Sequence, residues 1–348
     1  MSSTELPETI AAAVAPKASP VRAAPGERLS RVELAGLTLN VRSRPATRVG
    51  APPALYVHGL GGSSRNWSAL MPLLEDVVDG AAVDLPGFGD SAPPCDGNYS
   101  VTAHARAVVR LLDAGGRGPV HLFGNSLGGA VATQIAAARP DLVRTLTLIS
   151  PALPEIRVQR TAVPTALIAV PGLASLFSRV TREWTARRRT LGAMSLTYGD
   201  PANIDEEELR GAVAELERRL QLPHFWQAMT GSTRGIVNAY TLGGQHGLWR
   251  RAERVLAPTL LVYGGRDQLV SYRMARRASA AFRDSRLLTL PDAGHVAMME
   301  YPGEVARAGR DLIGAYEDAR AEDDGREAND ARAAEVTREH DVVEDGRS

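Results

Sequence analysis

Short apolar runs recur along the chain, and most of them end at a glycine or a polar corner. Two alternating runs flank Gly36 within residues 31–41 and predict a hairpin. Six further runs are rich in leucine or β-branched residues: 54–59, 81–87, 120–126, 146–150, 259–265 and 286–294. Because these six are apolar throughout, they predict strands of a sheet that helices cover on both faces.

Segments with helical character lie between the predicted strands. They are residues 68–76, 101–113, 127–138, 271–282 and 302–318. This alternation predicts the α/β class, with a doubly wound and mostly parallel sheet. In such a sheet, functional groups gather beyond the carboxyl ends of the strands.

Composition narrows the classes of partner. The 348 residues include 40 basic and 40 acidic side chains, for a formal net charge of zero. This balance argues against nucleic acid or an anionic membrane as an obligatory partner, since either favours a basic excess. The single cysteine, Cys95, fits a reducing compartment, and we expect a cytoplasmic protein.

The two ends of the chain differ from the middle. Residues 1–27 are rich in Ala, Pro and Ser and lack the basic start and continuous apolar stretch of a signal peptide. Residues 319–348 are dominated by charge and contain no aromatic residue. We expect both ends to be disordered or loosely helical tails, because such segments bury too little apolar area to offset their ordering entropy. We expect no membrane-spanning helix, because no window reaches about 18 uninterrupted apolar residues.

The stretch HLFGNSLGGA (121–130) carries the first chemical signal. Ser126 falls where a predicted strand turns into a predicted helix, with glycines at 124 and 128. A sharp corner of this kind strains the serine backbone and leaves no room for a side chain at Gly124 or Gly128. It also places the amide of Leu127 at a helix N-terminus, where an oxyanion could be held. The pattern predicts a nucleophile elbow.

A serine hydroxyl needs a base and an acid that orients the base. His295, in PDAGHVAMME, follows one predicted strand, and Asp267, in YGGRDQLV, follows another. The order Ser126, Asp267, His295 is the order found in hydrolases with a nucleophile elbow. We therefore predict that these three residues form a catalytic triad.

The segment HGLGG (58–62) follows a further predicted strand. A second backbone amide is needed beside that of Leu127 to stabilise the oxyanion, and it normally comes from this loop. We predict that His58 and Gly59 form the turn and that the amide of Leu60 is the second donor. His58 is expected to fix the loop and not to move protons.

These motifs resemble those of the α/β-hydrolase fold superfamily. The matching segments are HGLGG (58–62), DLPGFGDS (84–91), GNSLGG (124–129), YGGRD (263–267) and GHVAMMEYP (294–302). The resemblance implies a core of residues 28–151 and 251–318, interrupted by a helical cap over residues 152–250. It also implies that Asp84 and Asp90 are scaffold residues.

The resemblance suggests a substrate pocket near Trp67, Asn125 and Val296. Within the predicted cap, the apolar segment 163–177 is broken by prolines and followed by a basic run. One interpretation is a lid that touches lipid transiently. We favour the other, an apolar cap face that lines the substrate funnel, because the segment is too short and bent to span a membrane.

The parts predict a serine hydrolase that cleaves a small-molecule carboxylic ester through an acyl-enzyme, with no metal and no organic cofactor. The resemblance leaves alternatives. Carbon–carbon bond hydrolases share a Gly-Asn-Ser elbow, as at Asn125, but usually carry a tryptophan where this chain has Val296. Cofactor-free haloperoxidases generally lack a large cap, and binding members of the fold usually lose a triad residue. Dehalogenases and epoxide hydrolases use an aspartate where Ser126 stands.

Overall fold

The computed structural model describes residues 25–155, 159–170, 172–181, 183–241 and 245–345. Within these residues, eight strands form one sheet in the order β1-β2-β4-β3-β5-β6-β7-β8. Strand β2 is antiparallel to β1 and β4, and the other neighbours are parallel. The predicted α/β class is confirmed. The strands are β1 (Arg28–Leu34), β2 (Leu37–Arg44), β3 (Pro53–Val57), β4 (Asp79–Val83), β5 (Val120–Asn125), β6 (Val143–Ile149), β7 (Thr259–Gly264) and β8 (Ser285–Leu290).

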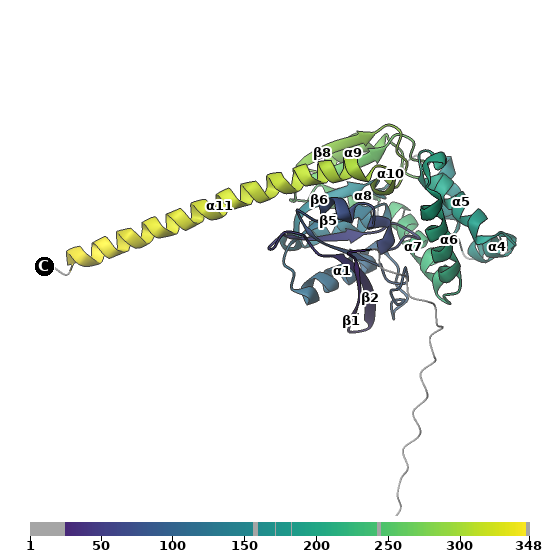
Figure 1. Ribbon diagram of the computed structural model, residues 1–348, viewed down its shortest axis with the longest axis horizontal. Helices are drawn as coiled ribbons and strands as arrows, with labels where there is room; N and C mark the ends of the chain where they lie inside the picture. The colour runs from purple at the N-terminus through teal and green to yellow at the C-terminus, as the bar shows by residue number, and fades with distance from the viewer. Residues whose placement is uncertain (1–24, 156–158, 171, 182, 242–244, 346–348) are drawn as a thin grey trace, which may run out of the picture.

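Helices cover both faces of the sheet (Figure 1). One face packs against α1 (Val101–Gly115), α2 (Leu127–Ala138), α8 (Gln245–Ala252) and α9 (Met274–Ala281). The other packs against α10 (Ala297–Glu300), α11 (Pro302–Asp345), η1 (Ser64–Trp67) and η2 (Met71–Leu74). Strand β3 shows the alternation that separates the two cores. Leu55 and Val57 join the first, whereas Ala54 and Tyr56 join the second.

The helical segment predicted over residues 68–76 is not one continuous helix. The structure has the 3-10 helices η1 and η2 there, with bonds from the Leu70 amide to Trp67 O and from the Leu73 amide to Leu70 O. Pro72 lies at the start of η2 and has no amide hydrogen to donate. The segment therefore takes short three-residue turns instead of a continuous α-helix.

Between β6 and β7 the described residues contain helices and no strand. The helices before α8 are η4 (Arg160–Ala162), α3 (Val163–Leu167), α4 (Leu173–Val180), α5 (Ala186–Thr197), η5 (Pro201–Asn203), α6 (Glu206–Leu220) and α7 (Phe225–Thr241), while η3 (Pro140–Leu142) precedes β6. Figure 1 shows α4 to α7 grouped at one end of the sheet. Helix α8 straddles the end of the predicted 152–250 segment, yet it packs on α2 and adds Leu248 and Trp249 to the core. We propose that the cap ends before α8.

The predicted N-terminal tail lies outside the described residues as far as residue 24. Glu27, at its end, is buried and pairs with Arg42. At the other end, the predicted tail takes its helical form, because α11 continues to Asp345 and projects away from the body (Figure 1). Its side chains are buried as late as Ile313 but exposed over residues 318–326. Pairs one turn apart, such as Arg326 with Glu322, support the helix where the core no longer does.

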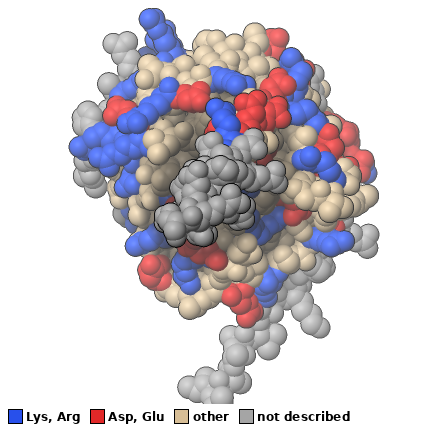
Figure 2. Space-filling model, turned by 90° about the vertical axis from the view of Figure 1, so that its left-hand side faces the viewer, with Lys and Arg blue, Asp and Glu red and all other residues tan. Residues whose placement is uncertain are grey.

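Charges of both signs are interspersed on the face that Figure 2 shows, in keeping with the zero net charge. Among the described residues, no helix combines the length and the apolar character needed to cross a membrane.

Candidate active site

Ser126 lies at the corner where β5 ends and α2 begins. Its backbone has φ 53° and ψ −117°, a strained combination for a residue other than glycine. Its amide donates to Ile149 O at 3.1 Å, and its carbonyl accepts from the amides of Ala130 and Ala152 at 3.1 and 2.9 Å. Bonds on both sides of the residue therefore hold the strained corner in place.

Two glycines make this corner sterically feasible. A methyl group on Gly128 would lie 2.1 Å from Val57 O, in the neighbouring strand. A methyl group on Gly124 would lie 2.5 Å from the carbonyl oxygen of Gly128. Because both obstacles are backbone atoms, no side-chain rotation could relieve them.

The His295 and Asp267 side chains meet beyond the ends of β8 and β7. His295 Nδ1 lies 2.9 Å from Asp267 Oδ2, and both residues are buried. Asp267 Oδ1 accepts from the amides of Leu269 and Val270 at 2.8 and 3.0 Å. Burial alone would raise the pKa of Asp267, but His295 and the two amides outweigh it and hold the pKa below its usual value. An ionised Asp267 thus orients the ring so that Nε2 is the free nitrogen.

The loop that carries His295 is also fixed by groups that the sequence did not single out. The His295 amide donates to Thr197 O at 2.6 Å, at the end of α5. Glu300 accepts from the amides of Gly294 and Gly199 at 2.8 and 2.7 Å. The sequence indicates this anchoring of the histidine loop only through Glu300, the glutamate within GHVAMMEYP. The loop's other partners, at positions 197 and 199, lie about a hundred residues away in the sequence.

The side chain of Asn125, which was predicted to lie in a substrate pocket, binds backbone carbonyls instead. The residue is buried, and its side-chain amide donates to Ile149 O at 3.1 Å and His295 O at 3.0 Å. Both amide hydrogens are thus used by backbone carbonyls. Asn125 joins the elbow to the histidine loop and has no donor left for a substrate.

The loop 58–62 lies directly against the elbow. A methyl group on Gly59 would lie 2.9 Å from Asn125 Oδ1 and 3.1 Å from Ser126 Cβ. No hydrogen bond joins Ser126 to His295 within the described part of the chain. Bonds of this kind often form only once a substrate is bound. The structure therefore brings the loop to Ser126 and Asp267 to His295.

His58 holds the loop through both ring nitrogens. Nε2 accepts from the Leu85 amide at 2.9 Å, so Nδ1 carries the hydrogen and donates to Gly59 O at 2.7 Å. Burial lowers the pKa of His58 to about 4, against the opposing charge of Asp84. A neutral ring of this kind fits a supporting role, as the sequence predicted for it.

The other two predicted pocket residues lie in the core. Trp67 is fully buried and packs against the stacked rings of Tyr56 and Phe123, at centroid distances of 5.3 and 6.4 Å. Val296 is also buried, in the same apolar cluster. Both side chains therefore contribute to the second core, and their predicted contact with substrate stays a prediction.

The corner at residues 84–91 is built around Asp84. Its carboxylate accepts from the Ser64 amide at 2.6 Å, the Asn40 side chain at 2.7 Å and the Asp90 amide at 2.9 Å. A carboxylate with all these partners is a structural anchor. In the described residues, no group of three or more His, Cys, Asp or Glu side chains is arranged to hold a metal ion.

Comparisons with known proteins identify the family of the chain. A family model described as the alpha/beta hydrolase fold matches residues 52–302. The dihydrolipoyllysine-residue acetyltransferase component of the acetoin cleaving system of Cupriavidus necator is 30% identical over 253 residues. That match covers 72% of this chain but only 60% of the relative.

Two further similarities involve relatives that are matched over most of their length. A pimeloyl-(acyl-carrier protein) methyl ester esterase of Neisseria meningitidis serogroup B is 25% identical, over 74% of this chain and 91% of the relative. The crystal structure of a haloalkane dehalogenase from Bradyrhizobium elkani superposes with a TM-score of 0.69 at 23% identity, covering 84% of this chain and 99% of that one. The structural likeness shows the shared fold alone.

Proposed function

The chain belongs to the alpha/beta hydrolase fold family, and we propose that it is a serine hydrolase that cleaves a carboxylic ester. The observation that carries the proposal is the strained Ser126 at the β5–α2 corner, beside the loop of Gly59. A corner of this conformation is costly to maintain, and such strain is concentrated at functional sites. The buried pair of Asp267 and His295 supplies an orienting acid and a base.

The reaction follows in two halves. Ser126 Oγ attacks the ester carbonyl carbon while His295 Nε2 takes its proton, and Asp267 stabilises the imidazolium. The amides of Leu60 and Leu127 bind the oxyanion, and the same histidine returns the proton to the leaving alcohol. Water, activated by His295, then attacks the acyl-enzyme and releases the acid.

An ester substrate with an apolar acyl or alcohol part is the simplest fit. The similarity to a methyl ester esterase supports the reaction type. The elbow sequence Gly-Asn-Ser left carbon–carbon bond cleavage as an alternative. The amide hydrogens of Asn125 are both bonded to backbone carbonyls, so this residue does not favour that alternative.

A fluorophosphonate probe tests the nucleophile. We expect the wild-type protein to be labelled and Ser126→Ala to lose labelling, with ester turnover reduced by at least about 10⁴-fold. Ser150→Ala is the matched control, because Ser150 also has a positive φ (44°) at a strand end but lies buried. Labelling of a folded Ser126→Ala would overturn the assignment. Graded p-nitrophenyl esters, compared with ring-cleavage dienones, distinguish ester from carbon–carbon bond cleavage.

A further inference from the structure

The amide of Leu60, the proposed second oxyanion donor, belongs to a chain of hydrogen-bonded peptide groups. Its own peptide group begins with the carbonyl of Gly59, which accepts from the Gly62 amide at 3.0 Å and from His58 Nδ1 at 2.7 Å. In a trans peptide the C=O and N–H point in opposite directions. Bonds to Gly59 O therefore fix the direction in which the Leu60 N–H points.

The chain of peptide groups continues to the cap. The Gly62 amide belongs to the same peptide group as the carbonyl of Gly61, and Gly61 O accepts from the guanidinium of Arg219 on α6. Arg219 thus donates to Gly61 O, and the Gly62 N–H donates to Gly59 O. The next N–H in this series is that of Leu60, the proposed oxyanion donor. Linked hydrogen bonds polarise one another, and a positive charge at the acceptor end strengthens the donor at the other end.

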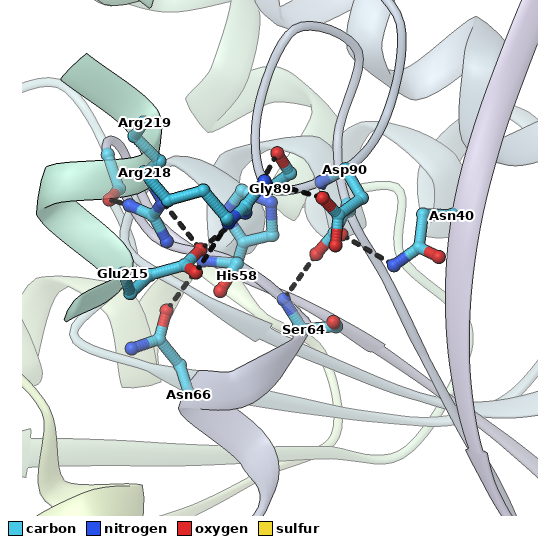
Figure 3. A network of polar contacts seen from close by, with 12 residues as sticks. Asn40, His58, Ser64, Asn66, Gly89, Asp90, Glu215, Arg218 and Arg219 are labelled. Carbon is cyan, nitrogen blue, oxygen red and sulfur yellow. Dashed lines mark hydrogen bonds and ion pairs between the residues drawn. The ribbon is translucent and has the colours of Figure 1, made fainter. Parts of the chain in front are cut away.

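Arg219 is itself held firmly. Glu215, one turn earlier on α6, accepts from Arg219 Nε at 2.8 Å and from Arg218 Nε at 3.1 Å. Arg218 in turn binds Asp90 Oδ1 at 2.6 Å and Gly89 O at 3.3 Å. Figure 3 shows Glu215, Arg218 and Arg219 reaching from the helix to the loop of His58 and the corner of Asp90.

The charge on this cluster is stable across the ordinary pH range. Burial alone would raise the pKa of Glu215, but Arg219 and Arg218 outweigh it and lower the pKa to about 2. Glu215 and Arg219 are both buried, so bulk water screens their pairing only weakly. The arginine therefore presents an oriented positive charge to Gly61 O.

We propose that Arg219 is a positioning residue for catalysis, which orients and polarises the Leu60 amide through the two intervening peptide groups. The inference rests on the proposed function, because it needs an oxyanion at Leu60. It makes the cap a part of the oxyanion-binding apparatus as well as a cover. Arg219 touches neither substrate nor reacting atoms, so its effect is confined to states that carry negative charge on the oxygen.

Arg219→Met keeps the length and apolar stem of the side chain and removes the charge and the donors. With p-nitrophenyl acetate we expect kcat to fall roughly tenfold, less than the ~100-fold typical of losing an oxyanion donor outright, and KM to stay nearly constant. Phenylboronic acid forms a tetrahedral adduct with a serine nucleophile, so its inhibition constant should rise by the same factor as kcat/KM falls. Arg210→Met is the control, since Arg210 lies exposed on the same helix.

A purely structural role gives a different result. If Arg219 only docks the cap, Arg219→Met should raise KM for the longer substrate p-nitrophenyl decanoate. The kcat for p-nitrophenyl acetate and the affinity for phenylboronic acid should then stay unchanged, and that outcome would overturn the inference. Should Arg219→Met fail to fold, Glu215→Gln serves instead. It removes the negative charge that orients Arg219 and leaves the guanidinium itself intact, and we expect a smaller but parallel loss in kcat and boronate affinity.

The wild-type protein separates this inference from the proposed function. A wild type that reacts with neither fluorophosphonate nor boronate overturns the function and the inference together. A wild type that reacts with both, with Arg219→Met and Glu215→Gln unchanged in boronate affinity, overturns the inference alone.

Discussion

The two sides of the candidate site are held to the cap by different kinds of contact. On the side of His295, the contacts are made mainly by backbone groups and short loops, and one carboxylate, that of Glu300, bridges two of the backbone amides. A methyl group on Gly294 would lie 2.4 Å from Gly199 N and from Thr197 O, so the cap and the histidine loop are packed backbone to backbone. Such contacts have one geometry and leave little room for adjustment.

On the side of Leu60, the cap reaches the core through long charged side chains. Arg218 and Arg219 extend from α6 to the carbonyls of Gly89 and Gly61. Side chains of this length depend on charge partners for their orientation. The comparison indicates that the base side is fixed by steric fit, whereas the oxyanion side is fixed by electrostatics and responds to changes in charge.

The largest effect is expected at the centre of the base side. Asp267→Asn should lower kcat about 10⁴-fold, because it favours the wrong imidazole tautomer and removes the charge that stabilises imidazolium. Steady-state kinetics with a p-nitrophenyl ester provide the measurement. Asp292→Asn is the control, since Asp292 is exposed and pairs with Arg266. Near-normal kcat in Asp267→Asn would mean that another carboxylate orients His295.

A smaller effect is expected where the cap meets the histidine loop. Glu300→Ala leaves the amides of Gly294 and Gly199 without their acceptor, which should cost about 2 kcal/mol of unfolding free energy. Because Gly294 directly precedes His295, we expect kcat/KM to fall roughly tenfold, a loss of ~1.4 kcal/mol in transition-state stabilisation. Glu304→Ala, at an exposed position in α11, should change neither quantity. Equal behaviour of the two variants would show that the base side does not need this bridge.

The two sides should also respond differently to pH. The folded-state pKa of Glu215 is lowered to about 2 from 4.5, so its stabilising contribution is present above pH 4.5 and is lost as the pH falls through about 2. Burial raises the folded-state pKa of Glu300. The contribution of that group to stability is therefore present below pH 4.5 and is lost as the pH rises through the folded-state pKa.

Urea unfolding between pH 7 and pH 3 measures this difference. Glu215→Gln should be destabilised by about 3 kcal/mol at pH 7, and its deficit relative to wild type should shrink below pH 4.5. Glu300→Gln should gain stability relative to wild type as the pH rises from 4.5 to 7. Parallel pH profiles for the two variants would contradict the electrostatic account of the oxyanion side.

The comparison also explains which parts of the site were predictable from sequence. Elements such as β5 and α2 are apolar runs with sharp ends, and the constraint on Gly124 comes from Gly128, four residues further along the chain. Local sterics leave a local pattern. The helical segment expected at residues 68–76 is only the short 3-10 helix η2, in which Pro72 has no amide hydrogen to donate.

Contacts between distant segments left no such pattern. Arg219 and Gly61 are separated by 158 residues, and a helix with several arginines gives no indication of which one reaches a buried carbonyl. Asn125 was misplaced for a related reason. The family resemblance suggested a place in the substrate pocket, whereas its side-chain amide donates to His295 O, 170 residues away.

The smallest effect is expected for the other carboxylate near the acid. Glu155 follows β6 and is the first carboxylate in the place where some members of the superfamily carry their acid. In the structure its Oε2 accepts from the Ser271 amide at 3.4 Å, whereas His295 Nδ1 faces Asp267 at 2.9 Å. Burial raises the pKa of Glu155, and the nearby charge of Asp267 adds to the shift, so a neutral side chain is well tolerated there.

Glu155→Gln should therefore keep kcat/KM within about twofold of wild type, in the same esterase assay that shows the loss in Asp267→Asn. The reverse ranking of these two variants would transfer the role of the acid to Glu155 and leave Ser126 and His295 in their proposed roles.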